Sequence, residues 1–277
     1  MDTQMSASTS FKTLHASGCF IIPNPWDIGS AKILHHIGFK ALATTSAGFA
    51  FSRGLPDDPA ALSLQDVLAH IKEIVEATPL PVNADFQSGY ANDLETLSRN
   101  VTLCTQTGVA GLSIEDATGI DASPLYDRAV AIERIRTARK AIDATGTGVW
   151  LTARCEAFLV GYPDAERVAL DRLVAFAEAG ADCLYAPRIT DPEIISRIVK
   201  AVAPKPVNAL MVSPVPGLTF SRLADLGVRR ISVGSALSRV ALGAFIRAAQ
   251  DILTTGNFDT LGDAAPFKDL NDIFSQQ

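Results

Sequence analysis

The chain has 277 residues, of which 48% are hydrophobic and 19% charged, and its formal net charge is −6. It contains no Lys/Arg cluster, which argues against nucleic acid and anionic membranes as partners. No apolar run reaches the roughly 18 residues of a membrane span and no secretion signal opens the chain, so we expect a soluble, cytoplasmic protein. The cysteines form no CxxC pair, which indicates buried thiols rather than disulfides or a zinc site: Cys19, Cys104, Cys155 and Cys183.

Strand-like and helix-like segments alternate from one end of the chain to the other. Short apolar runs predict strands at 19–23, 41–45, 81–85, 110–115, 149–154, 182–186, 206–211 and 230–233. Helical spacing follows each of them, at 28–37, 63–77, 93–107, 127–144, 163–179, 191–202, 219–226 and 236–253. Ser63 with Asp66 resembles an N-cap pair, and glycines such as Gly38 and Gly180 end helices.

Eight strand–helix pairs in roughly 250 residues predict an α/β fold, a closed (β/α)8 barrel of the TIM type. We expect one domain over 1–277, with the barrel core at 10–253. A doubly wound open sheet is the alternative, and it is less favoured because no Gly-rich phosphate fingerprint follows the first strand. The tail at 254–277 is irregular but apolar, so we expect it to pack on its own barrel or on a neighbouring subunit.

Two of the predicted strands end in carboxylates. Asp85 ends the run Pro81-Val-Asn-Ala-Asp85, and Glu115 ends Gly111-Leu-Ser-Ile-Glu115. The active site of a βα barrel lies where the strands end, so the two carboxylates can converge on one cation. Oxygen ligands of this kind favour Mg²⁺ or Mn²⁺ over zinc. The alternative is that each carboxylate only caps the helix that follows it.

Other strand ends carry further polar groups. Arg154 follows an apolar run and can clamp a carboxylate in bidentate fashion, or it can pair with Glu156 as scaffolding. Ser46, with the backbone N–H groups around Ala47 and Gly48, could cradle a carboxylate or an enolate oxygen. No histidine falls at a strand end, so proton transfer is left to carboxylates, a tyrosine, a lysine or metal-bound water.

Two connections between a strand and the next helix could also contribute. The connection at 117–127 is long, and such loops often close over a substrate. Its last residues, Tyr126 and Asp127, could equally anchor the next helix. The turn with Asp57 and Asp58 after the second strand adds two carboxylates near the mouth, or it is an ordinary surface turn.

Together these residues resemble the isocitrate lyase/phosphoenolpyruvate mutase superfamily over roughly residues 10–275. The resemblance rests on Asn24-Pro-Trp-Asp27 with Ser30-Ala31, Thr45-Ser46-Ala-Gly48, Leu55-Pro-Asp57, the segment 81–90, Ile114-Glu115-Asp116, Ala153-Arg154-Cys-Glu156-Ala-Phe158 and Ala179-Gly-Ala-Asp182.

The resemblance implies an α/β barrel that binds Mg²⁺ or Mn²⁺ and forms or consumes the enolate of a small 2-oxo acid. It implies Asp85 as the closest metal ligand, with Asp57 and Glu115 holding metal-bound waters. Ser46, Ala47, Gly48 and Asn208 would contact the substrate together with Asp85, and Arg154 would neutralise developing negative charge. Homodimers or homotetramers that exchange the last helix would account for the apolar tail.

The chain departs from the family pattern at two places. Gln87 stands where a second metal-site acid is usual, and an amide can still orient a metal-bound water. The loop after Glu115-Asp116 lacks the Cys, Lys and His of isocitrate and methylisocitrate lyases and the Lys and Asn of phosphonomutases. The sequence therefore favours an Mg²⁺-dependent lyase that cleaves a C–C bond of a 2-oxo or 2-hydroxy acid. The alternatives are C–P chemistry on a phosphonate, a non-catalytic 2-oxo-acid-binding barrel, and a flavin or phosphosugar barrel based on Gly234-Ser235.

Overall fold

The computed structural model describes residues 6–58 and 60–275. The predicted single domain over 1–277 and the expected lack of a secretion signal also involve residues 1–5, 59, 276 and 277, which lie outside the described residues.

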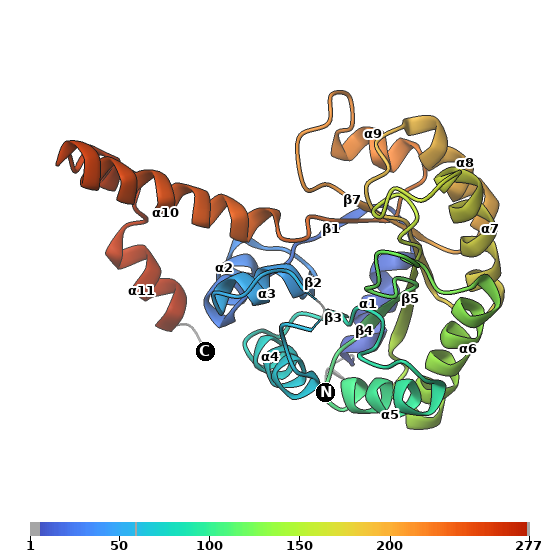
Figure 1. Cartoon of the computed structure of the whole chain (residues 1–277). Helices are drawn as coiled ribbons and strands as arrows, with labels where there is room; N and C mark the ends of the chain where they lie inside the picture. Colours follow the sequence, from blue (N-terminus) through green and yellow to red (C-terminus); the bar gives the residue numbers. More distant parts are fainter. Residues whose placement is uncertain (1–5, 59, 276–277) are drawn as a thin grey trace.

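Eight parallel strands form one sheet in the order β1-β8-β7-β6-β5-β4-β3-β2. Between the first and last members of that order, the Ala43 N–H donates to the Pro23 carbonyl at 3.0 Å, so the sheet curls into a nearly closed barrel (Figure 1). The predicted barrel is thereby confirmed over the open sheet. The strands are β1 (Phe20–Ile22), β2 (Leu42–Ala43), β3 (Val82–Asp85), β4 (Gly111–Glu115), β5 (Trp150–Arg154), β6 (Cys183–Tyr185), β7 (Val207–Leu210) and β8 (Arg230–Ser232).

The predicted helices all form, with bounds shifted by no more than two residues. They are α2 (Ile28–Ile37), α4 (Leu64–Glu76), α5 (Leu94–Thr105), α6 (Arg128–Thr145), α7 (Ala165–Glu178), α8 (Pro192–Val202), α9 (Phe220–Asp225) and α10 (Ala236–Thr255). Ser63 and Asp66 form the predicted capping box of α4. Over the part of the chain that the structure describes, no helix is long and apolar enough to cross a membrane.

Apart from the C-terminal tail, two helices had no counterpart in the sequence prediction. Helix α1 (Ala7–Ala16) packs where the strands begin, and its Phe11 ring meets the ring of Trp150 edge-on at 6.3 Å. Helix α3 (Ser46–Ser52) follows β2 directly and begins at Thr45, whose hydroxyl accepts from the Gly48 N–H. The first helix closes the bottom of the barrel, and the second forms part of its mouth.

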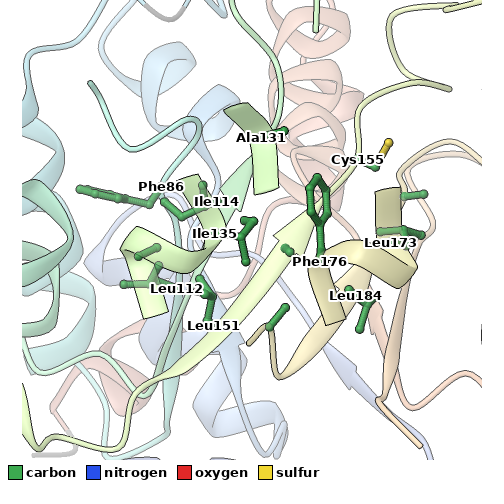
Figure 2. Close-up of a cluster of buried hydrophobic side chains, with 14 of the residues drawn as sticks. Phe86, Leu112, Ile114, Ala131, Ile135, Leu151, Cys155, Leu173, Phe176 and Leu184 are labelled. Atoms are coloured by element: carbon green, nitrogen blue, oxygen red, sulfur yellow. The ribbon is translucent and has the colours of Figure 1, made fainter. Parts of the chain in front are cut away.

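The strands alternate between apolar and polar side chains, and this alternation positions the site. In β4 and β5, Leu112, Ile114 and Leu151 belong to the main core, packed with the covering helices. The residues between them, such as Ser113 and Thr152, point the opposite way because successive side chains of a strand alternate. Figure 2 shows Ile135 of α6 and Phe176 of α7 beside the strand residues Leu112, Ile114, Leu151 and Leu184. The apolar core therefore lies between barrel and helices, and the barrel interior is polar.

The C-terminal tail differs from the irregular segment that we expected. It contains the 3-10 helix η1 (Asp259–Asp263) and helix α11 (Phe267–Ser275). Helix α10 projects away from the barrel, and α11 folds back toward α2, which it contacts (Figure 1). Many large apolar side chains of this arm are open to solvent, including Phe245 at 70% and Phe267 at 85% exposure. Part of the tail thus packs on its own barrel, while much of its apolar surface stays uncovered.

Candidate active site

A cavity of about 430 Å³ opens where the strands end, and each of the eight strands contributes at least one lining residue. Among the predicted site residues, Ser46, Ala47, Asp57, Asp85, Arg154 and Asn208 line it. This is the mouth of the barrel, where the sequence predicted the site. Glu115, Gln87 and Gly48 do not line the cavity.

Asp85 is held at the end of β3 by the chain next to β2. The Ser46 backbone N–H and hydroxyl both donate to Asp85 Oδ2 at 3.0 Å, and the Asp85 N–H donates to Thr44 Oγ1 at 2.9 Å. The Gly48 N–H is occupied by Thr45 Oγ1 at 3.2 Å, so only Ser46 and Ala47 of the predicted cradle face the cavity. Two hydrogen bonds from Ser46 therefore orient the carboxylate, and the bond to Thr44 holds the backbone of the same residue.

Arg154, at the end of β5, is surrounded by three carboxylates. Its Nη1 donates to Asp85 Oδ1 at 2.8 Å, its Nε donates to Glu156 Oε1 at 2.9 Å, and its Nη2 lies 3.2 Å from Glu115 Oε2. These are the contacts expected if Arg154 acts as scaffolding, the alternative that included its pairing with Glu156. Three carboxylates around one guanidinium give a formal charge of −2 when all are ionised. The cluster is short of positive charge.

Burial increases this imbalance. It raises the pKa of Glu115 to about 8, against the lowering influence of Arg154 and with the support of the nearby Glu156 charge. Burial also raises the pKa of Glu156, and burial together with the Asp85 charge raises the pKa of Asp57. Glu156 Oε2 is buried and has no hydrogen-bond partner among the described residues. The site therefore favours uptake of either a proton or a cation.

The donor set fits a hard divalent cation. Asp85 and Asp57 both line the cavity and offer carboxylate oxygens. Within residues 6–58 and 60–275, no three His, Cys, Asp or Glu side chains are grouped so that they could hold a metal ion by themselves. Mg²⁺ does not require such a group, because it commonly binds through one or two carboxylates and keeps several waters. Asp85, with Asp57 nearby, is the place where this chain could hold it.

Glu115 and Gln87 lie beside this place rather than in the cavity wall. Glu115 contacts the guanidinium of Arg154, and its backbone N–H donates to the Gln87 carbonyl at 3.0 Å. Gln87 itself has a left-handed backbone, with φ of 45°. The two residues thus support the positions of β3 and Arg154.

The loop between β4 and α6 is tied down at its base. Ala117 pairs with Leu125 in an antiparallel bridge, and Arg172 donates both to the buried Asp116 and to the Tyr126 carbonyl. The guanidinium of Arg134 stacks on the Tyr126 ring at 4.3 Å. These contacts support the interpretation of Tyr126 as an anchor.

The sequence prediction missed the residues deeper in the barrel. Arg230 lines the cavity, and its Nε donates to Asn208 Oδ1 at 2.8 Å. The Asn208 amide nitrogen in turn donates to Ser232 Oγ at 2.9 Å, so the oxygen and the nitrogen of this predicted substrate contact both have partners within the protein. The alternation of side chains along β8 could have identified them, because it puts Arg230 and Ser232 on the same face of the strand. As predicted, no histidine reaches the cavity; His15 and His70 are buried packing residues.

Comparison with known proteins agrees with this geometry. The sequence profile described as phosphoenolpyruvate phosphomutase matches residues 11–253. A Burkholderia cenocepacia J2315 protein assigned provisionally to the lyases or mutases has a crystal structure with a TM-score of 0.93, at 45% identity over 97% of this chain and 96% of that one. An uncharacterized Mycobacterium tuberculosis protein is 32% identical over 94% of both chains. A 2-methylisocitrate lyase from Salmonella typhimurium is 30% identical over 81% of this chain and 75% of its own. The chain belongs to the phosphoenolpyruvate phosphomutase family, within the isocitrate lyase/phosphoenolpyruvate mutase superfamily.

Proposed function

We propose that this protein is a divalent-metal-dependent lyase that cleaves a C–C bond of a small 2-oxo or 2-hydroxy carboxylic acid and leaves an enolate. The observation that carries the proposal is the Ser46–Asp85–Arg154 arrangement at the mouth of the cavity. In this arrangement the oriented Asp85 carboxylate could bind a cation, and the Arg154 guanidinium contacts the same carboxylate. The membership of a superfamily of lyases and mutases supports it.

The cation of this proposal is Mg²⁺ or Mn²⁺, held by Asp85, with Asp57 orienting bound water from the cavity wall. Glu115 and Gln87, which do not line the cavity, would support the site through Arg154 and β3. When bound, such an ion supplies Lewis-acid polarisation of a substrate oxygen. Asp85 is suited to this role because two hydrogen bonds from Ser46 orient its carboxylate, and the bond to Thr44 holds its backbone, before any ligand arrives.

Arg154 is the group that we propose for stabilising the enolate. An arginine carries five N–H donors, and three of those on Arg154 point at Asp85, Glu115 and Glu156. The two that are left can donate to an oxygen where negative charge develops during C–C cleavage. Ser46 and Ala47 also line the cavity, and the substrate carboxylate would lie against them.

C–P bond chemistry is the second candidate, because the matching family profile is that of a phosphomutase. The loop at 117–125 offers no Lys, His, Cys or Asn toward a phosphonyl group, and its Thr118 hydroxyl donates to the Ser123 carbonyl at 2.5 Å. This composition counts against a phosphonomutase, as it counts against isocitrate and methylisocitrate lyases, and it leaves the other C–C lyases of the superfamily as the first candidate.

We further propose that the protein works as a homodimer or homotetramer in which the arm formed by α10, η1 and α11 covers a neighbouring subunit. The exposed Phe245, Leu253 and Phe267 on this arm support the proposal, since a large uncovered apolar surface is unusual on a monomer.

The activity is tested by mass-spectrometric turnover of oxaloacetate, 2-methylisocitrate, 2,3-dimethylmalate, phosphonopyruvate and 2-oxoglutarate, each with Mg²⁺ and with chelator. Asp85→Ala measures spontaneous loss, and Asp58→Ala is the matched control, because Asp58 lies in the adjacent turn and its carboxylate binds the Ala60 N–H. Metal-dependent loss of one substrate, absent only in Asp85→Ala, supports the lyase. Turnover of phosphonopyruvate alone would replace it by C–P chemistry. Ligand binding without turnover would favour the non-catalytic barrel.

A further inference from the structure

The cavity continues below the strand ends into the polar interior of the barrel. Asn83, Ser113 and Arg230 line it there, and each lies one or more residues before the end of its strand. Interior layers of such barrels are usually filled by branched apolar side chains. The polar lining therefore makes the interior a candidate binding region.

Arg230 forms the floor of this region and is 3% exposed. Besides Asn208, its guanidinium reaches Thr152 Oγ1 on the opposite side of the barrel at 3.0 Å and lies 3.5 Å from His15 Nε2. Burial, together with the Arg230 charge, lowers the pKa of His15 to about 3, so this neighbour is neutral. Arg230 is thus a buried cation whose neighbouring side chains carry no charge.

Arg230 differs in this respect from the other arginines of the interior. Among the described residues, no carboxylate lies within 4.0 Å of it, whereas Arg154 has three and Arg172 has one. Arg134 is also buried without a carboxylate, but it donates to the carbonyls of Ser88 and Ala91 and does not line the cavity. A buried charge without a counter-charge is costly, and an anion in the adjoining cavity would offset that cost.

A second group in the same region lacks a partner. The amide oxygen Asn83 Oδ1 is buried, and no hydrogen-bond donor among the described residues reaches it. Asn83 lines the cavity like Arg230. A ligand that enters the interior would therefore meet one strong donor group and one free acceptor.

The depth of the floor sets the length of the ligand. Thr152, which Arg230 contacts, precedes Arg154 by two residues on β5, and a strand rises about 3.3 Å per residue. The Thr152 contact of Arg230 therefore lies about 7 Å below the backbone of Arg154 along β5. A ligand with carboxylates at both ends of a short carbon chain can reach both levels, and a monocarboxylate of pyruvate size cannot.

We propose that Arg230 binds the distal carboxylate of the substrate, so that the enzyme takes a 2-oxo or 2-hydroxy dicarboxylic acid of about four or five carbons. This proposal rests on the lyase function proposed above, in which the other end of the acid lies at Asp85 and Arg154. Arg230 would then determine specificity, because its charge rewards only an acid that carries a second anionic group.

The test compares malate with 2-hydroxybutyrate, which has a methyl group in place of the distal carboxylate, by isothermal titration calorimetry with Mg²⁺. Wild-type protein should bind malate about 10- to 100-fold more tightly, the range expected for one charge-assisted hydrogen bond. Arg230→Gln should bring the ratio close to one and leave 2-hydroxybutyrate binding unchanged. Arg229→Gln is the matched control, because Arg229 is the preceding residue and donates outward to the Gly18 carbonyl.

Three results would overturn the proposal. They are a wild-type ratio near one, an unchanged ratio in Arg230→Gln, and a loss of preference in Arg188→Gln or Arg239→Gln instead, since these two exposed arginines also line the cavity. If Arg230→Gln does not fold, Arg230→Lys decides: it keeps the charge but loses the fork, so the ratio should fall and not stay constant. Oxalate with Mg²⁺, tested on wild type and Asp85→Ala, measures the metal end separately. If oxalate binds equally to wild type and Asp85→Ala while wild type still prefers malate, the proposed metal site is rejected and the proposed role of Arg230 is not.

Discussion

The three carboxylates around Arg154 make a strong prediction about stability. Arg154→Ala would leave Asp85, Glu115 and Glu156 clustered without their shared cation, which now lies 2.8, 3.2 and 2.9 Å away. Removing one partner of a buried ion pair typically costs about 3–5 kcal/mol of unfolding free energy. Uptake of protons relieves part of this, because burial already raises the pKa of Glu115 and Glu156. We therefore expect a loss of about 3 kcal/mol at pH 8 and about 1 kcal/mol at pH 5.5.

The assay is urea unfolding at both pH values with a chelator, followed by tryptophan fluorescence. Arg128→Ala is the control, because Arg128 forms one exposed ion pair with Asp171 at 2.5 Å, and exposed ion pairs contribute little to stability. Added Mg²⁺ should return part of the stability of Arg154→Ala by replacing the lost charge. An equal loss in the two variants, or a loss that does not change with pH, would refute the charge argument.

Three further predictions test other parts of the molecule. Asp85→Asn should weaken Mn²⁺ binding at least about tenfold in a paramagnetic resonance titration while Asp58→Asn does not, because Asp85 lines the cavity and Asp58 does not. Burial raises the pKa of Glu115 from 4.5 to about 8, so its contribution to stability is present below pH 4.5 and is lost as the pH rises through 8. Melting temperatures measured with chelator should therefore fall over this range, and Glu115→Gln should make them depend less on pH. Phe267→Glu should dissociate the proposed oligomer in analytical ultracentrifugation, because Phe267 is 85% exposed on the arm, and a monomeric wild type would contradict the proposal.

The barrel could be predicted because each of its elements carries its own local signal. Alternating apolar runs, helix caps such as Ser63 with Asp66, and the left-handed glycine at Gly38 mark the boundaries without reference to the rest of the chain. The missed helices α1 and α3 depend on tertiary contacts instead. Helix α3 has only seven residues, and the first N–H group of that helix is satisfied by Asp85 from β3, far away in the sequence.

The positions of the residues at the mouth of the barrel could be predicted from topology, but their side-chain contacts could not. Parallel strands place Asp85 and Arg154 at one end of the barrel whatever their rotamers are. Whether Arg154 faces a substrate or Glu156 depends on side-chain packing that no local pattern contains. For the same reason the sequence could not distinguish Glu115, which contacts Arg154 beside the cavity, from Asp57, which lines it.

Topology could not identify Arg230, because this residue stands at the start of a strand. Residues at that end of a barrel usually contribute to stability and not to the active site. Beside Arg229, Arg230 resembles one of two surface arginines, yet alternation sends the first outward to Gly18 and the second across the interior to Thr152. Such a side chain gives up the packing energy of an apolar layer and adds the cost of a buried charge. A fold that tolerates both losses at the floor of its cavity has a polar interior suited to binding, and the comparison of malate with 2-hydroxybutyrate measures how much of that cost a ligand offsets.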